Sequence, residues 1–208
     1  MEERTGKLWA KQDQHEGDRW RLFNAVAGAI EAERVLYPGC YVDVSASFAF
    51  ADVTYVDVDA RAARFFADEA GVEEIIAEHP PVPDRSQFRF IHSDYSADLG
   101  LEDESFDLLV SLYAGFSSES CTRYLRVGGT LLVNPSHGDA SMAAIDDRYE
   151  LTGVVVSRAG GYGVRTHGLD GYLIPKGDIE ITAELLHERG RGIAYTKTPF
   201  AYLFRRVG

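Results

Sequence analysis

The stretch FDLLVSL at residues 106–112 decides the fold, because it is apolar at nearly every position. A run of this kind predicts a fully buried strand in the middle of a sheet. On its C-terminal side, residues 117 onward predict a short helix that ends before the glycines at 128 and 129, and residues 130–133 predict the next strand. Strand, helix and strand in this order are typical of an α/β fold.

The segments before residue 106 repeat this alternation. Residues 18–30 carry apolar side chains at helical spacing, and residues 35–37, 53–57 and 88–91 predict three more strands. Asp59 is placed to cap a helix after the second strand, and the segment after that helix is expected to end at Pro80, Pro81 and Pro83. Apolar strands that alternate with helices predict a mostly parallel sheet covered on both faces and joined by right-handed crossovers.

The last quarter of the chain changes pattern. Residues 149–156 and 172–174 predict strands that are joined across a glycine-rich turn, residues 178–189 a helix and residues 200–206 a final strand. We expect a single domain over residues 1–208, with a polar, irregular N-terminal extension at 1–17 and a hairpin insertion at 149–177. The strands at 149–156 and 200–204 could offer an edge for a homodimer.

The charge balance argues against a nucleic-acid partner. The chain has 208 residues with 21 Lys and Arg against 33 Asp and Glu, so its net charge is −12 and it repels phosphate backbones. Nucleic acid would need a local basic patch, and the simplest interpretation of the candidate residues is a solvated edge of the molecule. These residues are Arg189, Arg191, Lys197, Arg205 and Arg206.

Cysteine content and hydropathy indicate in which cellular compartment the protein is expected. Cys40 and Cys121 cannot form a four-thiolate zinc site, so we expect no metal and a reducing compartment. Residues 1–21 carry charges throughout, and no apolar run reaches the length of a membrane helix. The expectation is a cytoplasmic protein without a membrane partner.

Polar and glycine residues come directly after the predicted strands, where a ligand would bind. In an open parallel sheet, ligands bind at the carboxyl ends of the strands where the strand order reverses. Gly39 follows the first strand, and its missing Cβ would let the backbone approach a ligand closely. Asp57 ends the second strand, where a carboxylate can accept both hydroxyls of a ribose. Asp94 follows the third strand and is placed to accept from an exocyclic amine.

These segments resemble the ligand-binding segments of the class I S-adenosylmethionine-dependent methyltransferases. The resemblance is carried by VLYPGC at 35–40, VDVD at 56–59, SD at 93–94, LEDESFDLLVS at 101–111 and YLRVGGTLL at 124–132. It implies a Rossmann-like methyltransferase fold, an α/β fold with a mostly parallel seven-stranded sheet, helices on both faces and an antiparallel last strand. It also implies S-adenosylmethionine as the cofactor.

The resemblance assigns cofactor contacts to individual residues. Gly39 would lie against the methionine part of the cofactor, Asp57 would hold the ribose, and Asp94 with Tyr95 would contact the adenine. Val58 and Ser111 stand in matching segments and are expected to bind the cofactor as well. These assignments follow from the family and not from the residues alone.

The glycine-rich loop departs from the family pattern. Where the family usually has acid-x-Gly-x-Gly-x-Gly, this chain has Tyr37, Gly39, Tyr41 and Asp43. We expect Tyr41 and Asp43 to lie at the cofactor, with Asp43 either near its carboxylate, which like charge disfavours, or paired with its amino group. The alternative is a closed loop in a catalytically silent Rossmann-like module that serves in binding or dimerisation.

The methyl acceptor leaves little trace in a sequence, because methyl transfer is an in-line displacement that mainly needs alignment. SLYA at 111–114 lacks the Asn/Asp-Pro-Pro-Tyr/Phe motif of enzymes that methylate amino groups of bases or glutamine, so a small-molecule substrate is expected. His137 follows the fifth strand and is a candidate general base. Tyr113 lies where the family often contacts its acceptor. A nicotinamide-dependent oxidoreductase ranks last, because the full glycine fingerprint is missing.

Overall fold

The computed structural model describes residues 1–79 and 87–208, so the prediction for Pro80, Pro81 and Pro83 lies outside the described residues. The helices are α1 (Glu3–Gln12), α2 (Asp18–Ala27), α3 (Ala60–Phe66), α4 (Glu69–Ala77), α5 (Ser117–Cys121), α6 (Asp139–Ile145) and α7 (Ala183–Arg189), with 3-10 turns η1 (Ser45–Phe48) and η2 (Thr122–Tyr124). The strands are β1 (Arg34–Pro38), β2 (Asp52–Asp57), β3 (Gln87–His92), β4 (Phe106–Ser111), β5 (Leu125–Val133), β6 (Tyr149–Arg158), β7 (Gly161–Arg165) and β8 (Ala201–Arg206).

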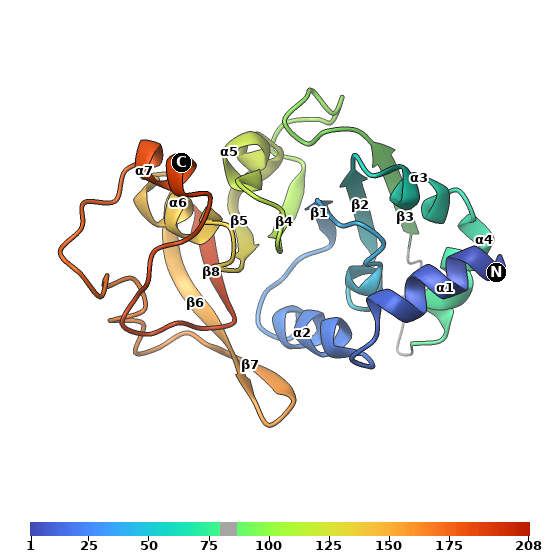
Figure 1. Ribbon diagram of the computed structural model, residues 1–208, viewed down its shortest axis with the longest axis horizontal. Coiled ribbons are helices and arrows are strands. Elements are labelled where there is room, and N and C mark those ends of the chain that lie inside the picture. The colour runs from blue at the N-terminus through green and yellow to red at the C-terminus, as the bar shows by residue number, and fades with distance from the viewer. Residues whose placement is uncertain (80–86) are drawn as a thin grey trace.

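All of these strands belong to one sheet, in the order β3-β2-β1-β4-β5-β8-β6-β7 (Figure 1). β1 pairs in parallel with β2 and β4, and β3 and β5 extend this parallel part on either side. β8 runs antiparallel to β5 and β6, and β6 forms an antiparallel hairpin with β7. The predicted α/β fold, with a mostly parallel sheet and an antiparallel last strand, is confirmed. The described strands number eight rather than seven because β7 extends the sheet.

Helices cover both faces of the sheet, as predicted. Successive side chains of a strand point to opposite faces, so Leu108 and Val110 of β4 join the core under α2, whereas Leu109 joins the core under α5 and α6. Two apolar cores on either side of the same strands explain why these strands are continuous apolar runs in the sequence. None of the described helices has the length and apolar character needed to cross a membrane.

The N-terminal segment differs from its prediction. Residues 3–12 form α1, where the polar sequence predicted irregular chain. The helix is held by tertiary contacts: the Trp9 ring meets the Phe48 ring edge-on at 5.8 Å between centroids, and the Glu2 amide donates to Asp68 at 2.7 Å. In Figure 1, α1 lies across α3 and α4 at one end of the sheet.

The C-terminal quarter also needs correction. Residues 172–174 form no strand, and the hairpin partner of β6 is β7. The predicted helix at 178–189 is shorter, because α7 begins only after Thr182, whose hydroxyl accepts from the Leu185 amide at 3.2 Å. β8 is flanked by β5 and β6 along its length, so it offers no free edge. A homodimer remains a prediction.

Candidate functional site

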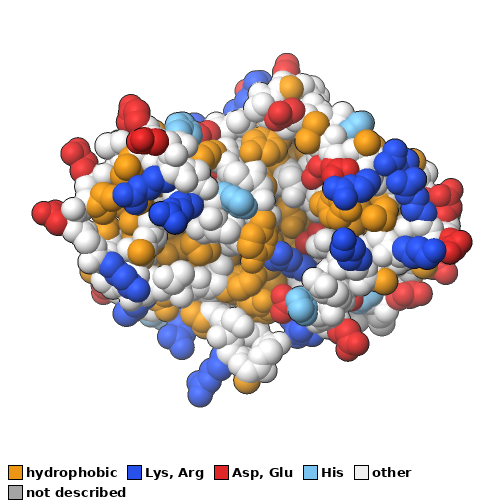
Figure 2. Space-filling view, viewed as in Figure 1, with side chains coloured by type: hydrophobic (Ala, Val, Ile, Leu, Met, Phe, Trp, Pro, Cys, Tyr) orange, Lys and Arg blue, Asp and Glu red, His pale blue; other side chains and the backbone are white. Residues whose placement is uncertain are grey.

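A cleft of about 310 Å³ lies at the carboxyl ends of the strands, where the order reverses between β1 and β4. Six of the eight residues that line this cleft were singled out from the sequence, and the other two are their neighbours in the chain. The lining residues are Gly39, Asp57, Val58, Ser93, Asp94, Tyr95, Tyr113 and Ala114. Figure 2 shows apolar side chains gathered along the middle of one face of the molecule, with most charged side chains around the periphery.

The carboxylate of Asp57 is held in one orientation by the backbone. One oxygen accepts from the Tyr41 amide at 2.7 Å, and the other accepts from the Asp59 amide at 2.7 Å. A carboxylate oxygen has two lone pairs, so each oxygen can accept one further hydrogen bond from the cleft. The arrangement suits two neighbouring hydroxyl donors, as in a ribose.

The loops after β1, β3 and β4 are tied together at the floor of the cleft. Gly39 adopts φ +66°, and a Cβ at this position would lie only 2.6 Å from the Cβ of Ala114. The Tyr95 hydroxyl donates to the carbonyl of Ala114 at 2.6 Å. Glycine is therefore required at position 39 by the close approach of the neighbouring loop as well as by its backbone conformation.

Val58 and Asp94 give the cleft an apolar surface and an acceptor. The Val58 side chain is 66% exposed, which is high for an aliphatic residue directly after a strand. Hydrogen bonds from the amide and hydroxyl of Ser96 hold the pKa of Asp94 below its usual value, so this carboxylate is ionised near neutral pH. A planar base with an amino group has a matching pattern of surfaces.

Two tyrosines at the site adopt backbone conformations that favour glycine. Tyr41 has φ +50° and Tyr113 has φ +61°, a region that costs a residue with a side chain about 1–2 kcal/mol. Tyr41 stands at a position where the family pattern has a glycine, and its backbone lies in the left-handed region that glycine favours. Its ring lies 5.1 Å from the guanidinium carbon of Arg61 and does not line the cleft. The altered loop leaves the cleft open.

Asp43 lies away from the cleft, contrary to the expectation from the sequence. Its carboxylate is buried, accepts from the Tyr37 hydroxyl at 3.0 Å and the Ser45 amide at 3.1 Å, and lies 3.7 Å from Nε of Arg19. Burial, followed by the nearby Asp43, raises the pKa of Tyr37 well above its usual value, so Tyr37 remains a donor. These partners draw Asp43 into the core beneath the loop.

Ser111 and His137 also lie outside the cleft. Ser111 is buried at the end of β4 and donates to Asp139, which also accepts from the Ser118 amide at 3.1 Å. Burial raises the pKa of Asp139 despite these donors. His137 is exposed on the loop after β5 and contributes to neither of the two cavities beside Tyr113.

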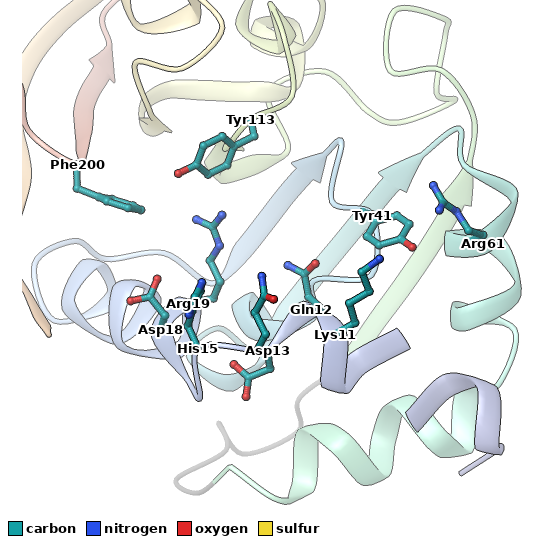
Figure 3. Close-up of a pocket in the computed structure, with 11 residues that line it drawn as sticks. Lys11, Gln12, Asp13, His15, Asp18, Arg19, Tyr41, Arg61, Tyr113 and Phe200 are labelled. Atoms are coloured by element: carbon teal, nitrogen blue, oxygen red, sulfur yellow. The ribbon is translucent and has the colours of Figure 1, made fainter. Parts of the chain in front are cut away.

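Sequence reasoning missed a second cavity, of about 550 Å³, on the other side of Tyr113 (Figure 3). Much of its wall comes from the end of α1, the following loop and the start of α2, a segment whose polar residues carry no motif that signals a site. The lining residues are Lys11, Gln12, Asp13, Gln14, His15, Asp18, Arg19, Tyr41, Arg61, Tyr113 and Phe200. Within residues 1–79 and 87–208, no group of three His, Cys, Asp or Glu side chains is placed to hold a metal ion.

Comparison with known proteins finds similar folds only. No family model matches the sequence, and no curated protein matches it. Among solved structures, the 16S rRNA methylase RmtB is 13% identical, with a TM-score of 0.49, over 95% of this chain and 65% of its own. The N-methyltransferase NodS from Bradyrhizobium japonicum, solved with S-adenosyl-L-homocysteine, is 15% identical, with a TM-score of 0.46, over 70% of this chain and 81% of its own.

A third solved structure, the YcgJ protein from Bacillus subtilis, is 21% identical with a TM-score of 0.43 and matches over 58% of this chain. The chain spans 51% of YcgJ and 65% of RmtB, which is less than two thirds of either protein. The strand order of the sheet, and not these matches, defines the fold of this chain.

Proposed function

We propose that the protein binds S-adenosylmethionine in the 310 Å³ cleft and transfers its methyl group to a small molecule. The observation that supports this most directly is the Asp57 carboxylate, which faces a cleft at the order reversal of the sheet with free acceptor capacity. The proposal also includes the cofactor contacts of Gly39, Val58, Asp94 and Tyr95, all of which line this cleft.

The cleft has the size and the pattern of hydrogen-bond acceptors that the adenosyl part of this cofactor needs. A volume of about 310 Å³ is at the lower end of the range for small-molecule sites. Asp57 would accept from the ribose hydroxyls, Val58 would cover one face of the adenine, and Asp94 would accept from the adenine amino group. The methionine part would extend past Gly39 toward Tyr113, which separates the cleft from the second cavity.

Methyl transfer requires little acid or base catalysis from the protein. The cofactor supplies an electrophilic methyl group on a positively charged sulfur. A lone pair of the acceptor would form the new bond to the methyl carbon while the carbon–sulfur bond would break with its electron pair left on sulfur. The acceptor would then pass a proton to water or to a base. The residues of the chain would bind, orient and exclude water, which provides much of the rate enhancement in such displacements.

A catalytically silent binding module remains the second candidate. The observation in its favour is the loss of the acid and of two glycines from the loop, at Tyr37, Tyr41 and Asp43. The open cleft argues for a retained ligand, because a vestigial site would be expected to fill with the Tyr41 ring. Turnover separates the candidates, since both allow the cofactor to bind but only the enzyme forms S-adenosylhomocysteine.

Calorimetric titration with S-adenosylmethionine and S-adenosylhomocysteine tests the binding site. We expect saturable binding of both ligands and a loss of roughly tenfold or more in affinity for Asp57→Asn, since a carboxylate that accepts two hydroxyl hydrogen bonds is lost. The matched control is Asp147→Asn, which changes an exposed carboxylate that lines neither cavity.

Two results would contradict the proposed function. One is the absence of binding heat at millimolar ligand with folded wild-type protein. The other is an Asp57→Asn variant, shown to be folded by its thermal transition, that binds as tightly as the wild type. Stabilisation by NADH, but not by S-adenosylmethionine, would favour the oxidoreductase alternative instead.

A further inference from the structure

The 550 Å³ cavity lies next to the proposed cofactor cleft and has a chemistry of its own (Figure 3). The two cavities meet at Tyr113, which lines both of them. A ligand in the larger cavity would therefore approach the end of a cofactor bound in the cleft. The charges and apolar surfaces of this cavity indicate what kind of ligand it accepts.

The acidic side chains that line this cavity already accept hydrogen bonds from other parts of the protein. Asp13 accepts from the Gly17 amide at 2.7 Å, and Asp18 accepts from the Tyr162 hydroxyl at 3.0 Å. Among the cations, Arg61 pairs with Asp59 at 2.5 Å. Lys11 has no ion pair among the described residues, so its ammonium group is available to a ligand.

Arg19 is oriented toward the cavity by groups beneath the glycine-poor loop. Its Nε lies 3.7 Å from the buried Asp43, and its guanidinium carbon lies 4.9 Å from the centre of the Tyr113 ring. Its Nη1 is buried without a hydrogen-bond partner among the described residues. Nη1 has almost no accessible surface of its own, but the Arg19 side chain is 21% exposed and lines the cavity, so its positive charge favours an anionic ligand there. A guanidinium also matches a carboxylate in geometry.

Three aromatic residues also line this cavity, beside the polar side chains of Gln12, Gln14 and His15. Tyr41, Tyr113 and Phe200 line the cavity, and the Phe200 ring is held by an edge-on contact with Tyr162 at 4.8 Å between centroids. A ligand whose body is planar and apolar would pack between such rings. The volume of about 550 Å³ lies within the usual range for a small-molecule site.

We infer that the cavity bounded by Arg19, Lys11, Tyr113 and Phe200 binds a small aromatic carboxylate, with the carboxylate on Arg19 and Lys11 and the ring between Tyr113 and Phe200. This ligand is the methyl acceptor, an assignment that rests on the proposed function. Asp43 is a positioning residue, because it orients the Arg19 guanidinium without lining the cavity itself.

Ligand-observed fluorine NMR tests this inference with 4-fluorobenzoate as the probe and 4-fluorobenzamide as its neutral analogue. We expect saturable binding of the benzoate and no saturable binding of the amide. Arg19→Gln should weaken benzoate binding roughly tenfold or more through the loss of a charge-assisted contact, and Lys11→Gln should weaken it a few-fold. Arg64→Gln is the control, because Arg64 is exposed and lines neither cavity.

Lys11→Gln keeps the test valid if Arg19→Gln does not fold, because Lys11 is exposed and makes no ion pair in the described part of the chain. The inference is overturned if the amide binds as tightly as the benzoate, if benzoate binding is not saturable, or if it is unchanged in Lys11→Gln. A large loss of S-adenosylhomocysteine affinity in folded Arg19→Gln would also overturn it, since the guanidinium would then belong to the carboxylate of the cofactor.

The two proposals fail separately. Asp57→Asn should weaken S-adenosylhomocysteine binding roughly tenfold or more, whereas 4-fluorobenzoate should bind as it does to the wild type. If the wild type binds the benzoate but not S-adenosylhomocysteine, the proposed function fails and the carboxylate site stands. If it binds S-adenosylhomocysteine but not the benzoate, the cofactor site stands and the assignment of the acceptor fails.

Discussion

At the scale of single residues, Gly39 carries the strictest steric requirement of the proposed cofactor cleft. We predict that Gly39→Ala lowers the free energy of unfolding by about 1–2 kcal/mol for its left-handed backbone. A further ~1–3 kcal/mol is expected because the new Cβ would overlap Ala114, which would have to move. Chemical denaturation with urea measures the sum.

Gly100→Ala provides the matched control for this prediction. Gly100 has φ +63°, close to the φ +66° of Gly39, but a Cβ there would meet nothing within 4 Å. Its substitution should therefore show the backbone cost alone. Equal losses of stability in the two variants would refute the close approach between Gly39 and Ala114.

The buried carboxylate of Asp139 predicts a dependence of stability on pH. Burial raises its pKa in the folded protein above the usual value near 3.8, so the folded chain holds this proton more tightly than the unfolded chain. The resulting stabilisation is fully present below the usual value and is lost as the pH rises through the raised pKa. We predict that the wild type loses stability relative to Asp139→Asn between acidic and neutral pH.

Urea unfolding of both proteins at acidic and at neutral pH measures this difference. One oxygen of Asp139 accepts from both the Ser111 hydroxyl and the Ser118 amide, and the single side-chain oxygen of Asp139→Asn can do the same, so the variant is expected to fold. A difference in stability that does not change with pH would show that Asp139 titrates alike in the folded and unfolded chains.

At the scale of elements, the docking of α1 is open to a direct test. Trp9 is half-buried and packs edge-on against Phe48, so Trp9→Ala should cost about 2 kcal/mol, less than the roughly 3–5 kcal/mol of a fully buried aromatic residue. Lys7→Ala is the control on the same helix, because its exposed pair with Glu3 should contribute less than about 1 kcal/mol. Similar thermal transitions for wild type and Trp9→Ala would mean that α1 does not dock as described.

Elements whose local sequence and burial agree could be predicted, and β4 is the example. Its residues are buried between two cores, so an apolar run was sufficient to identify it. α1 could not be predicted, because its stability comes from contacts of Trp9 with a distant turn and not from an apolar stripe. The prediction of a strand at residues 172–174 was wrong for the opposite reason. Their apolar side chains suggested a strand, but Tyr172 is buried in a loop, and its backbone carbonyl accepts from the Tyr202 hydroxyl.

Some residues of the candidate site could also be predicted from the sequence, and others could not. Gly39, Asp57 and Asp94 could be placed because the ends of parallel strands meet at one edge of the sheet. Asp43 could not, since its orientation depends on Arg19, which lies far earlier in the sequence and carries no motif. The second cavity was missed for a related reason, because it forms only when the start of α2 and the loop before it pack beside Tyr113.

At the scale of the whole molecule, the charge distribution predicts weak interaction with nucleic acid. Two of the five residues of the basic patch have acidic partners, since Arg205 pairs with Glu150 at 2.6 Å and Arg206 with Glu104 at 3.2 Å. With a net charge of −12, we predict no saturable binding of a labelled single-stranded RNA at physiological salt of about 0.15 M. Fluorescence anisotropy measures this, and a salt-sensitive saturable isotherm would contradict it.

Tyr113 lies between the two cavities and lines both of them. Its backbone amide donates to the Asn134 side-chain oxygen at 3.2 Å, which holds this residue in place. A shift of this ring on binding of a ligand in one cavity would change the shape of the other cavity. Binding of a ligand in one cavity would then change the affinity of the other cavity for its ligand. Thermodynamic linkage requires the factor to be the same in both directions. A carboxylate in one cavity and S-adenosylhomocysteine in the other should therefore change each other's dissociation constant by the same factor, which titration of each ligand in the presence of the other would measure.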